Sequence, residues 1–308
     1  MFINPNWSSG GQIMKRVSVF VFIIAMMFIS TFCNAQDTYK IGVLAKDGPV
    51  KALKMWKSTG EYLSTRIGAT FEVVPLDFDA VFSAIEKNEV HFFLVNSSMF
   101  ITAQVNYGAK AIATMINSRQ GIPLKNFGGV IFTSEENDAV NSLSDLKGKT
   151  FMAVEESSFG GWQMAYMEFL NQGIDPQKYF SKIEFGGKHD NVVLAVQNGL
   201  VDAGTVRTDT LERMAAAGTI QLSEFKILNE KKYEGFPFVC STTLYPEWPM
   251  AITKGTSDTI AQKVVDALKM LKPEDKAAQD AKVVGWTDAL DYQGVNDLLK
   301  KLRLGAYK

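Results

Sequence analysis

The sequence predicts an α/β protein with two lobes joined by two hinge crossings. Strand-like and helix-like segments alternate along the chain, as in sheets covered by helices. The alternation comes in two successive sets, and 308 residues are enough for two lobes with a sizeable core. Hydrophobic residues make up 46% of the chain and charged residues 21%, as in globular proteins. We therefore expect mainly parallel sheets sandwiched by helices.

The first set of strands and helices precedes Gly128. Its strands are predicted from β-branched and apolar runs, and its first helix carries Leu53, Trp56 and Leu63 at helical spacing. The predicted strands cover residues 40–45, 70–76, 91–96 and 109–117, and the predicted helices cover residues 50–66 and 80–88.

The second set begins with a strand at 128–133. Its helix at 160–172 stops at Gly173, a typical helix-end residue. The chain after residue 243 is expected to be mostly helical and to pack back on the first lobe. The other predicted strands cover residues 150–155, 182–185, 203–206 and 225–228, and the other helices cover residues 191–199, 209–217, 256–271 and 292–302.

Two extended crossings, near residues 128–131 and 237–241, are predicted to join the lobes. Lobe one then consists of residues 36–128 and 240–308, and lobe two of residues 129–239. A body of this kind closes around a ligand by hinge motion.

Residues 1–35 are predicted to comprise upstream residues and a signal peptide, with Met14 as the expected translation start and residues 1–13 upstream of it. Lys15 and Arg16 precede an apolar run, and Cys33-Asn34-Ala35 then leads into polar sequence, so cleavage after Ala35 is expected. The apolar run is shorter than the ~20 residues that a spanning helix needs, although an uncleaved anchor remains the alternative. A lipid-anchored Cys33 is disfavoured because Phe32 is bulky.

No cofactor, metal or nucleic acid is expected. After cleavage Cys240 is the only cysteine, so no internal disulfide can form, and its apolar neighbours predict a buried, inert thiol. Two histidines and one cysteine argue against structural zinc, which normally takes four such ligands. A net charge of −1 provides no basic field for nucleic acid.

Three segments with donors or positive charge fall where a strand ends and a helix begins. They are residues 157–162, 186–190 and 199–209. Open parallel sheets present their ligand crevices at this edge. Because hydroxyl groups, backbone N–H groups, Lys188, His189 and Arg207 converge there, the sequence predicts a site for a small oxyanion.

The turn at 157–161 is the first candidate. Ser157, Ser158, Phe159 and Gly160 offer backbone N–H groups at a helix start together with two hydroxyl groups, which suits an anion. The alternative is that Ser157 or Ser158 only caps the helix.

His189 starts a helix after two glycines that let the backbone approach a ligand closely. We expect it to donate to an oxyanion and to gain charge as the pH falls. In the alternative, it lies on the surface and Asp190 caps the helix.

Arg119, in the loop 117–121, and Arg207, after the strand 203–206, can each hold a sulfonate or phosphonate by two parallel hydrogen bonds. Plain solvent exposure is the alternative for both. Asn96 and Ser97 follow another strand end and join the candidate site, unless Ser97 only caps the next helix.

Aromatic side chains are further candidates for the pocket wall. Trp56, Phe78 and Tyr245 could line it beside Phe159, whereas we expect Trp162 and Trp248 in the core.

No catalytic residues are predicted. Ser158, His189 and Asp190 supply the residue types of a triad, but an adjacent His and Asp cannot easily form its oriented pair. No G-x-S-x-G motif occurs.

Seven short motifs follow one another along the mature chain. They are GVLA (42–45) with Trp56, FGGVIF (127–132), SFGG (158–161), HD (189–190) with AVQNGLVDAG (195–204), VRTD (206–209) and STTLYPEWP (241–249). In this order they resemble one family, the type II periplasmic binding proteins related to the phosphonate-binding component of ABC transporters. Within it, the chain most resembles the periplasmic sensor domains of tetrathionate-type histidine kinases. The resemblance covers residues 38–308.

This resemblance implies a bilobed periplasmic-binding-protein type II fold and a non-enzymatic, periplasmic receptor for a small sulfur or phosphorus oxyanion. Its partner would be a membrane histidine kinase or, alternatively, an ABC permease. The turn at 157–161 has fewer Ser and Thr residues than in phosphonate binders, which favours the sensor branch. Sensor kinases continue beyond this domain, whereas the sequence stops at Lys308, so we expect a free-standing protein or a fragment of a split gene.

Overall fold

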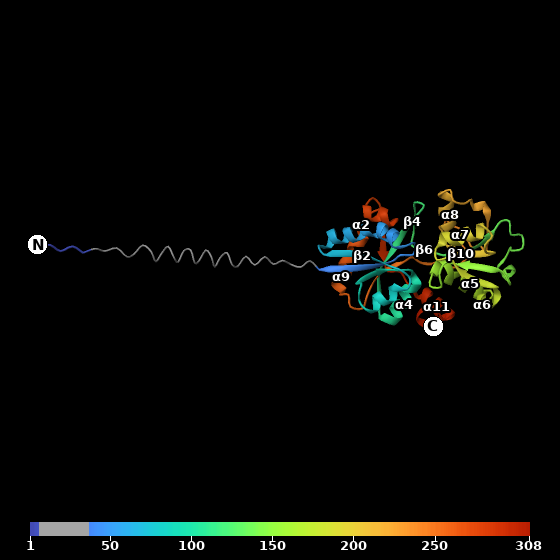
Figure 1. Ribbon diagram of the computed structural model, residues 1–308, viewed down its shortest axis with the longest axis horizontal. Helices are drawn as coiled ribbons and strands as arrows, with labels where there is room; N and C mark the ends of the chain where they lie inside the picture. The colour runs from blue at the N-terminus through green and yellow to red at the C-terminus, as the bar shows by residue number, and fades with distance from the viewer. Residues whose placement is uncertain (6–36) are drawn as a thin grey trace. The chain divides into compact units, whose positions relative to one another are not determined.

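Two lobes make up residues 37–308, and each is a sheet with helices packed on it (Figure 1). The computed structural model describes residues 1–5 and 37–308. The expected signal sequence from Lys15 to Ala35, and its cleavage position, therefore lie outside the described residues. Among the described residues, no helix is both long and apolar enough to cross a membrane.

The sheet of the first lobe has seven strands in the order β14-β4-β13-β3-β1-β2, with β5 paired to β4. β1 runs parallel to β2 and β3, whereas β13 runs antiparallel to β3 and β4, and β14 antiparallel to β4. The strands are β1 (Thr38–Leu44), β2 (Thr70–Leu76), β3 (Phe92–Leu94), β4 (Lys110–Arg119), β5 (Ile122–Leu124), β13 (Pro249–Ile252) and β14 (Val283–Asp288).

The helices of the first lobe cover both faces of this sheet. In Figure 1, α2 lies on the upper side of the lobe, and α4 and α11 lie on the lower side. α2 buries Trp56 and Leu63, two of the residues expected at helical spacing, while Leu53 is exposed. The helices are α2 (Pro49–Ile67), α3 (Ala80–Glu86), α4 (Ser97–Tyr107), α9 (Asp258–Lys269), α10 (Lys276–Ala281), α11 (Gln293–Leu302) and the 3-10 turn η4 (Gly305–Tyr307).

The sheet of the second lobe has five strands in the order β11-β7-β10-β8-β9. β8 runs parallel to β9 and β10, and β7 runs antiparallel to β10 and β11. Along β7, Val130 and Phe132 join one apolar cluster and Ile131 joins another, because successive side chains of a strand point to opposite faces. The strands are β7 (Gly129–Ser134), β8 (Thr150–Ala153), β9 (Lys182–Phe185), β10 (Ala203–Arg207) and β11 (Phe225–Leu228).

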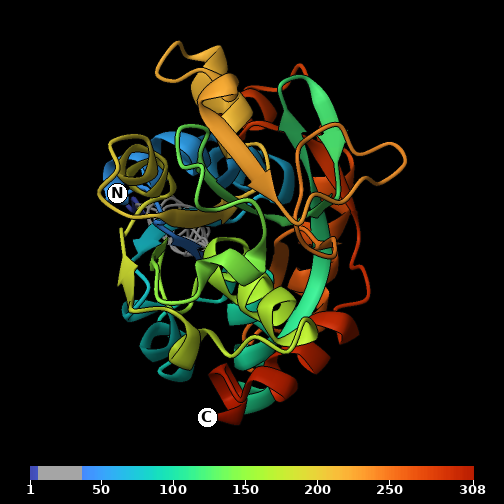
Figure 2. The same cartoon turned by 90° about the vertical axis from the view of Figure 1, so that its right-hand side faces the viewer.

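Helices also cover the second sheet, which faces the viewer in Figure 2. The helix expected at 160–172 is a π-helical turn followed by an α-helix, and Gly173 ends it with a φ of 75°. The helical elements are η1 (Leu143–Leu146), η2 (Phe159–Gln163), α5 (Met164–Asn171), α6 (Pro176–Tyr179), α7 (His189–Gln197), α8 (Thr210–Ala216) and η3 (Leu222–Glu224).

A two-stranded antiparallel ribbon lies between the sheets. β6 (Asn126–Phe127) pairs with β12 (Tyr245–Pro246), and β6 is visible between the lobes in Figure 1. Ser241 still contacts the second sheet, since its hydroxyl accepts from the N–H of Ile131 in β7 at 2.9 Å. The ribbon is thus a few residues beyond the crossing expected at 237–241, and the lobe boundaries stay a prediction.

The type II bilobed α/β fold is confirmed, but two expectations about its elements are wrong. The sheets are mixed, because β7, β13 and β14 run against their neighbours. The chain after residue 243 is not mostly helical, because β13 and β14 complete the first sheet. The four residues of β13 are all buried, so they show no alternation by which a strand could be recognised.

Candidate functional site

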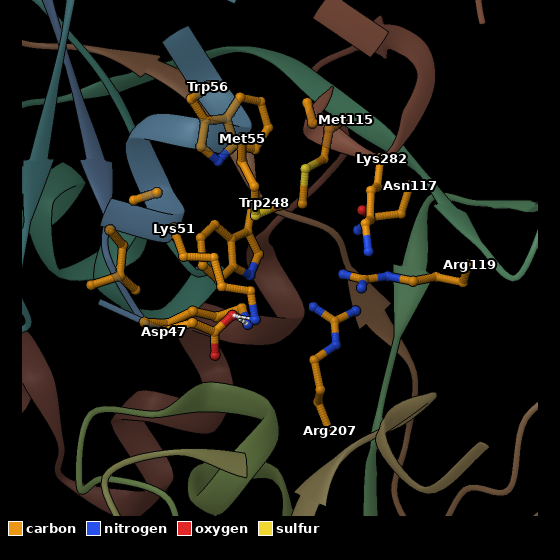
Figure 3. A pocket seen from close by; sticks show the side chains of 14 residues that line it. Asp47, Lys51, Met55, Trp56, Met115, Asn117, Arg119, Arg207, Trp248 and Lys282 are labelled. Atoms are coloured by element: carbon orange, nitrogen blue, oxygen red, sulfur yellow. Dashed lines mark hydrogen bonds and ion pairs between the residues drawn. The ribbon is translucent and has the colours of Figure 1, made fainter. Parts of the chain in front are cut away.

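Two arginines face each other between the lobes. Arg119 is the last residue of β4 and Arg207 is the last residue of β10, so each belongs to a different sheet. Figure 3 shows their guanidinium groups pointing toward one another. The expected loop around Arg119 is a strand end instead, because Gln120 and Gly121, both at positive φ, form the tight turn of a hairpin with β5.

Arg207 is anchored on three sides. Its Nη2 donates to Oε1 of Glu247 at 2.7 Å, its Nε lies 3.4 Å from Oδ1 of Asp209, and its guanidinium lies 4.4 Å from the ring centre of Phe127. Although burial acts to lower it, Glu247 and Asp209 raise the pKa of Arg207. Arg207 is 6% exposed, so it is a buried, fixed cation and not an exposed surface residue.

Arg119 is held more loosely. Its Nη1 lies 3.2 Å from Oδ2 of Asp209, and this is its ion pair within the described residues. Burial and the charge of Arg207 lower the pKa of Arg119. Within residues 37–308, Nε of Arg119, Nε of Arg207 and Nδ2 of Asn117 are buried without a hydrogen-bond partner. Such donors are costly to leave unpaired, so this arrangement favours an acceptor between them.

A cavity of about 50 Å³ opens beside the arginine pair, and we call it the arginine cavity. A water needs about 10–15 Å³, so there is room for a group of only a few atoms. One wall is polar and the other is apolar, with Met55, Trp56, Met115 and Trp248 on one side in Figure 3. Its lining consists of Leu44, Lys46, Asp47, Lys51, Ala52, Met55, Trp56, Met115, Asn117, Arg119, Arg207, Trp248, Ala281 and Lys282.

A second cavity of about 20 Å³ adjoins it through four shared residues, and we call it the turn cavity. Leu44, Lys46, Arg207 and Trp248 line both. The other residues of the turn cavity are Phe78, Asn96, Phe127, Val154, Ser158, Phe159, Gly160 and His189. Six of the sequence-derived candidates, namely Asn96, Ser158, Phe159, Gly160, His189 and Arg207, therefore meet at one place.

Ser97 and Ser157 do not join them. The hydroxyl of Ser97 is buried and donates to the carbonyl of Pro246 at 2.7 Å, which ties α4 to the ribbon. Ser157 faces a different cavity, and its carbonyl accepts from Nδ2 of Asn96 at 3.3 Å. Asn96, not Ser97, caps α4, because its Oδ1 accepts from the N–H of Met99 at 2.9 Å.

The turn after β8 presents its backbone to the turn cavity. The N–H of Gln163 donates to the carbonyl of Ser158 at 3.1 Å, which closes the π-helical turn. Ser158 makes no side-chain cap, so the capping alternative for it is not realised. The first N–H groups of such a turn have no partner within the helix and are free to meet an anion.

His189 is buried as the first residue of α7, and its charge differs from the expectation. Its Nδ1 accepts from the backbone N–H of Arg207 at 3.2 Å, which leaves Nε2 as the donor of the neutral ring. Burial and the charges of Lys46 and Arg207 hold the pKa of His189 well below 6.5. The expectation that His189 becomes charged as the pH falls to mildly acidic values is therefore wrong.

The sequence interpretation missed Lys46, Asp47 and Lys51. Nζ of Lys46 lies 2.6 Å and Nζ of Lys51 lies 3.3 Å from Oδ2 of Asp47. Burial lowers the pKa of Lys46, whereas Lys46 and Lys51 outweigh burial and hold the pKa of Asp47 below its usual range. Lys46 and Asp47 lie two and three residues past Leu44, the end of β1, so the strand-end rule that found Arg207 could have found them.

The aromatic expectations are met in part. Trp56, Phe78 and Phe159 line the two cavities, and Tyr245 packs on Phe159 with ring centres 5.1 Å apart instead of lining either one. Trp162 is in the core as expected. Trp248 is buried as well, but its ring also forms the wall between the two cavities, which its burial alone does not indicate.

The related proteins of known sequence include a sensor kinase and a solute-binding protein. The tetrathionate sensor histidine kinase TtrS of Salmonella typhimurium is 28% identical over 261 residues, which cover 84% of this chain and 43% of that protein. The phosphonates-binding periplasmic protein of Escherichia coli is 26% identical over 154 residues, which cover 48% of this chain and 41% of that protein. The chain thus spans less than half the length of either relative.

A solved structure has the same fold. PhnD1 of Prochlorococcus marinus, solved in complex with methylphosphonate, superposes with a TM-score of 0.67 at 18% identity, over 87% of this chain and 98% of that chain. Residues 41–293 match the family described as the periplasmic substrate-binding protein of phosphonate ABC transporters. The chain belongs to this phosphonate-binding family of periplasmic solute-binding proteins.

Proposed function

We propose that this protein is a non-enzymatic periplasmic receptor for a small sulfur or phosphorus oxyanion, which it binds between its lobes. The observation that carries the proposal is the pair Arg119 and Arg207. The two cations come from different sheets, face each other, and keep buried donors unpaired among the described residues. An anion between them would satisfy these donors and join the lobes.

The ligand-binding residues that we propose come from the arginine cavity and the turn cavity. Ser157, beside the turn cavity, is added as a supporting residue. Arg119 and Arg207 would hold the anion, and Ser158, Phe159, Gly160 and the Nε2–H of neutral His189 would donate from the second lobe. Asn96 would bridge to the turn through Ser157, which becomes a supporting contact. Lys46 adds positive charge between the two cavities. Ser97 supports the ribbon instead of the ligand.

As for its role, we propose the sensing subunit of a two-component system, with a membrane histidine kinase as partner. The similarity to TtrS over 84% of this chain supports this. The alternative is the delivery subunit of an ABC importer, which the family and the phosphonates-binding protein of Escherichia coli support. Either role requires export, and we propose that the signal peptide is cleaved after Ala35.

Thermal-shift measurements on the purified protein test the ligand class. Tetrathionate, thiosulfate, sulfonates, phosphite and phosphonates would be compared with sugars and amino acids of similar size. At 100 times its Kd a ligand adds about 2.7 kcal/mol to the free energy of unfolding, which raises Tm clearly. Stabilisation by one oxyanion, lost in Arg119→Ala, supports the proposal. Stabilisation by sugars or amino acids alone would exclude it.

Pull-down from membranes distinguishes the two roles. The protein, tagged and loaded with the stabilising oxyanion, would retain either a histidine kinase or a permease from the membranes of its own organism. Retention of a kinase supports the sensing role, and retention of a permease supports the import role.

A further inference from the structure

The arginine cavity has two unlike sides. On one side the guanidinium groups of Arg119 and Arg207 face each other across the lobes, where they can hold the oxygens of an anionic head by parallel hydrogen bonds (Figure 3). The other side is apolar and comes from three parts of the first lobe. It consists of Met55 and Trp56 of α2, Met115 of β4, and Trp248 between β12 and β13.

The apolar side restricts what the rest of the ligand can be. Trp56 and Trp248 are each 7% exposed and Met115 is 4% exposed, so this wall is held in place by the core. A charged or strongly hydrated group placed against thioether and ring carbon atoms would lose water and gain few hydrogen bonds in return. A short apolar substituent gains free energy from the same contact. The wall therefore favours an anion that carries an apolar group over one with oxygens on every side.

The charges around the cavity restrict the charge of the ligand. Three buried or half-buried cations each pair with one carboxylate, so that the six charges sum to zero. The pairs are Lys46–Asp47 at 2.6 Å, Arg119–Asp209 at 3.2 Å and Arg207–Glu247 at 2.7 Å.

The remaining polar groups change this balance little. Lys51 and Lys282 line the cavity as well, but both are exposed, so water and salt screen their charges. His189 in the adjoining turn cavity is neutral, because its pKa is held well below 6.5. A second negative charge on the ligand would therefore meet no further buried cation among the described lining residues. The balance favours a monoanion over a dianion.

The volume of the arginine cavity restricts the length of the apolar group. The cavity measures about 50 Å³. Since a water needs about 10–15 Å³ of such volume, there is room for about three to five atoms of that size. A tetrahedral head with three oxygens uses most of this room. The space that is left suits a substituent of one or two carbon atoms.

We propose, resting on the oxyanion-receptor function proposed above, that the ligand is a monoanion with a short apolar substituent, of the alkanesulfonate class. Its three oxygens would accept from Arg119 and Arg207, and its one or two carbon atoms would pack on Met55 and Trp248. A sulfonate carries one charge throughout the neutral pH range, whereas a phosphonate of the same shape takes a second. The cavity thus selects by charge and by apolar contact among ligands that share one tetrahedral head.

Calorimetric titration at pH 8 tests the charge preference and the length limit. Methanesulfonate and methylphosphonate have nearly the same shape, but methylphosphonate is mostly a dianion at this pH. We expect methanesulfonate to bind about tenfold more tightly, on the scale of one uncompensated charge in a partly buried site. Ethanesulfonate should bind about fourfold more tightly than methanesulfonate, because it buries one further CH₂ group. Hexanesulfonate, which is too long for the cavity, should bind more weakly than ethanesulfonate.

Met55→Gln tests the apolar wall. Glutamine has nearly the length of methionine but places a polar amide at the wall, so the fourfold advantage of ethanesulfonate over methanesulfonate should disappear. Met270→Gln makes the same change at a residue that is 52% exposed and should keep the advantage. An unchanged Tm in the absence of ligand establishes that the variants are folded.

The outcomes separate this proposal from the function on which it rests. Equal or tighter binding of methylphosphonate by the wild type would overturn the charge preference and with it the proposal. The same ethanesulfonate advantage in Met55→Gln and Met270→Gln would overturn it as well. Binding of phosphonates or other oxyanions without binding of alkanesulfonates would overturn the ligand class proposed here and leave the oxyanion receptor intact. Absence of binding by every oxyanion would overturn both.

Discussion

Arg119 and Asp209, which come from the first and the second lobe, form an ion pair of 3.2 Å between Nη1 and Oδ2. The same carboxylate lies 3.4 Å from Nε of Arg207. One acid therefore sits between two cations that would otherwise repel each other, and it competes with any anion for their donors. Four predictions start from this cluster and its neighbours.

Arg119→Ala should weaken binding of the stabilising oxyanion by about 1.5–3 kcal/mol, the usual worth of a hydrogen bond to a charged group. The fold should persist, because Arg119 has one ion pair among the described residues and its loss leaves Asp209 paired with Arg207. Calorimetry with the oxyanion measures the loss. Arg66→Ala, on the exposed last turn of α2, is the control and should bind normally. Full affinity in Arg119→Ala would place the site elsewhere.

Asp209→Asn should strengthen oxyanion binding, and it should also lower stability, because removing one partner of a buried ion pair leaves the arginine charges uncompensated. The substitution removes the competing negative charge, and asparagine tolerates the φ of 71° at this position. Affinities of the wild type and the variant at two salt concentrations measure the effect, which should change little with salt because Asp209 is buried. Weaker binding in Asp209→Asn would mean that the carboxylate positions the arginines more than it competes.

His189→Gln should make stability less dependent on pH between 7 and 5. Because the pKa of His189 is held well below 6.5 in the fold, the unfolded chain takes up a proton first as the pH falls. Its contribution to stability is thus complete above about pH 6.5 and declines below it, by at most about 1.4 kcal/mol per pH unit. Urea unfolding at pH 7, 6 and 5 gives the slope.

His91→Gln is the comparison for this prediction. The pKa of His91 is also lowered, by burial and by Lys40, so His91 changes the pH dependence of stability in the same direction as His189. The His91→Gln variant measures this second contribution separately. If the free energy of unfolding of His189→Gln changed with pH as it does in the wild type, the pKa of His189 would not be lowered by folding.

Gly160→Ala should lower both stability and oxyanion affinity. A Cβ there would lie 2.8 Å from Cε2 of Phe127 and 2.9 Å from Cβ of Arg207, and neither atom is the end of a flexible side chain. The crowding costs about 1–3 kcal/mol and displaces Arg207. Gly255→Ala is the matched control, since its nearest atom would be 3.5 Å away. Thermal unfolding and calorimetry compare the two, and equal behaviour would contradict the packing argument.

Much of the fold could be predicted because local sequence determines it. The strands at 70–76, 182–185 and 225–228 occur with the expected bounds. Those at 70–76 and 225–228 are largely apolar, and the strand at 182–185 alternates charged and apolar residues. Strand direction could not be predicted. β7 and β13 run antiparallel because of where the chain crosses between lobes, and no residue within these strands carries that information.

The candidate site could also be predicted in part from the sequence. Arg119, Arg207, His189 and Ser158 were found because polar residues at strand ends stand out. Trp248 was assigned to the core, since a buried ring and a ring that forms a cavity wall have the same sequence context. The lowered pKa of His189 comes from its burial and then from Lys46, which is far from it in sequence, so the residue alone could not reveal it.

Phe159 has one further consequence for the proposed receptor. Its ring is 1% exposed, although it belongs to the second lobe, because it packs on Phe127 and Tyr245 of the ribbon and joins the apolar cluster of the first lobe. Separating the lobes would return much of this ring to water, a penalty of about 1.5–3 kcal/mol for a side chain of this size. This contact therefore holds the two lobes together even when no ligand is bound. In the proposed sensing role, a membrane partner that detects shape alone would register a background signal in the absence of ligand. The contrast between its two signals would then depend on keeping this lobe–lobe contact weak.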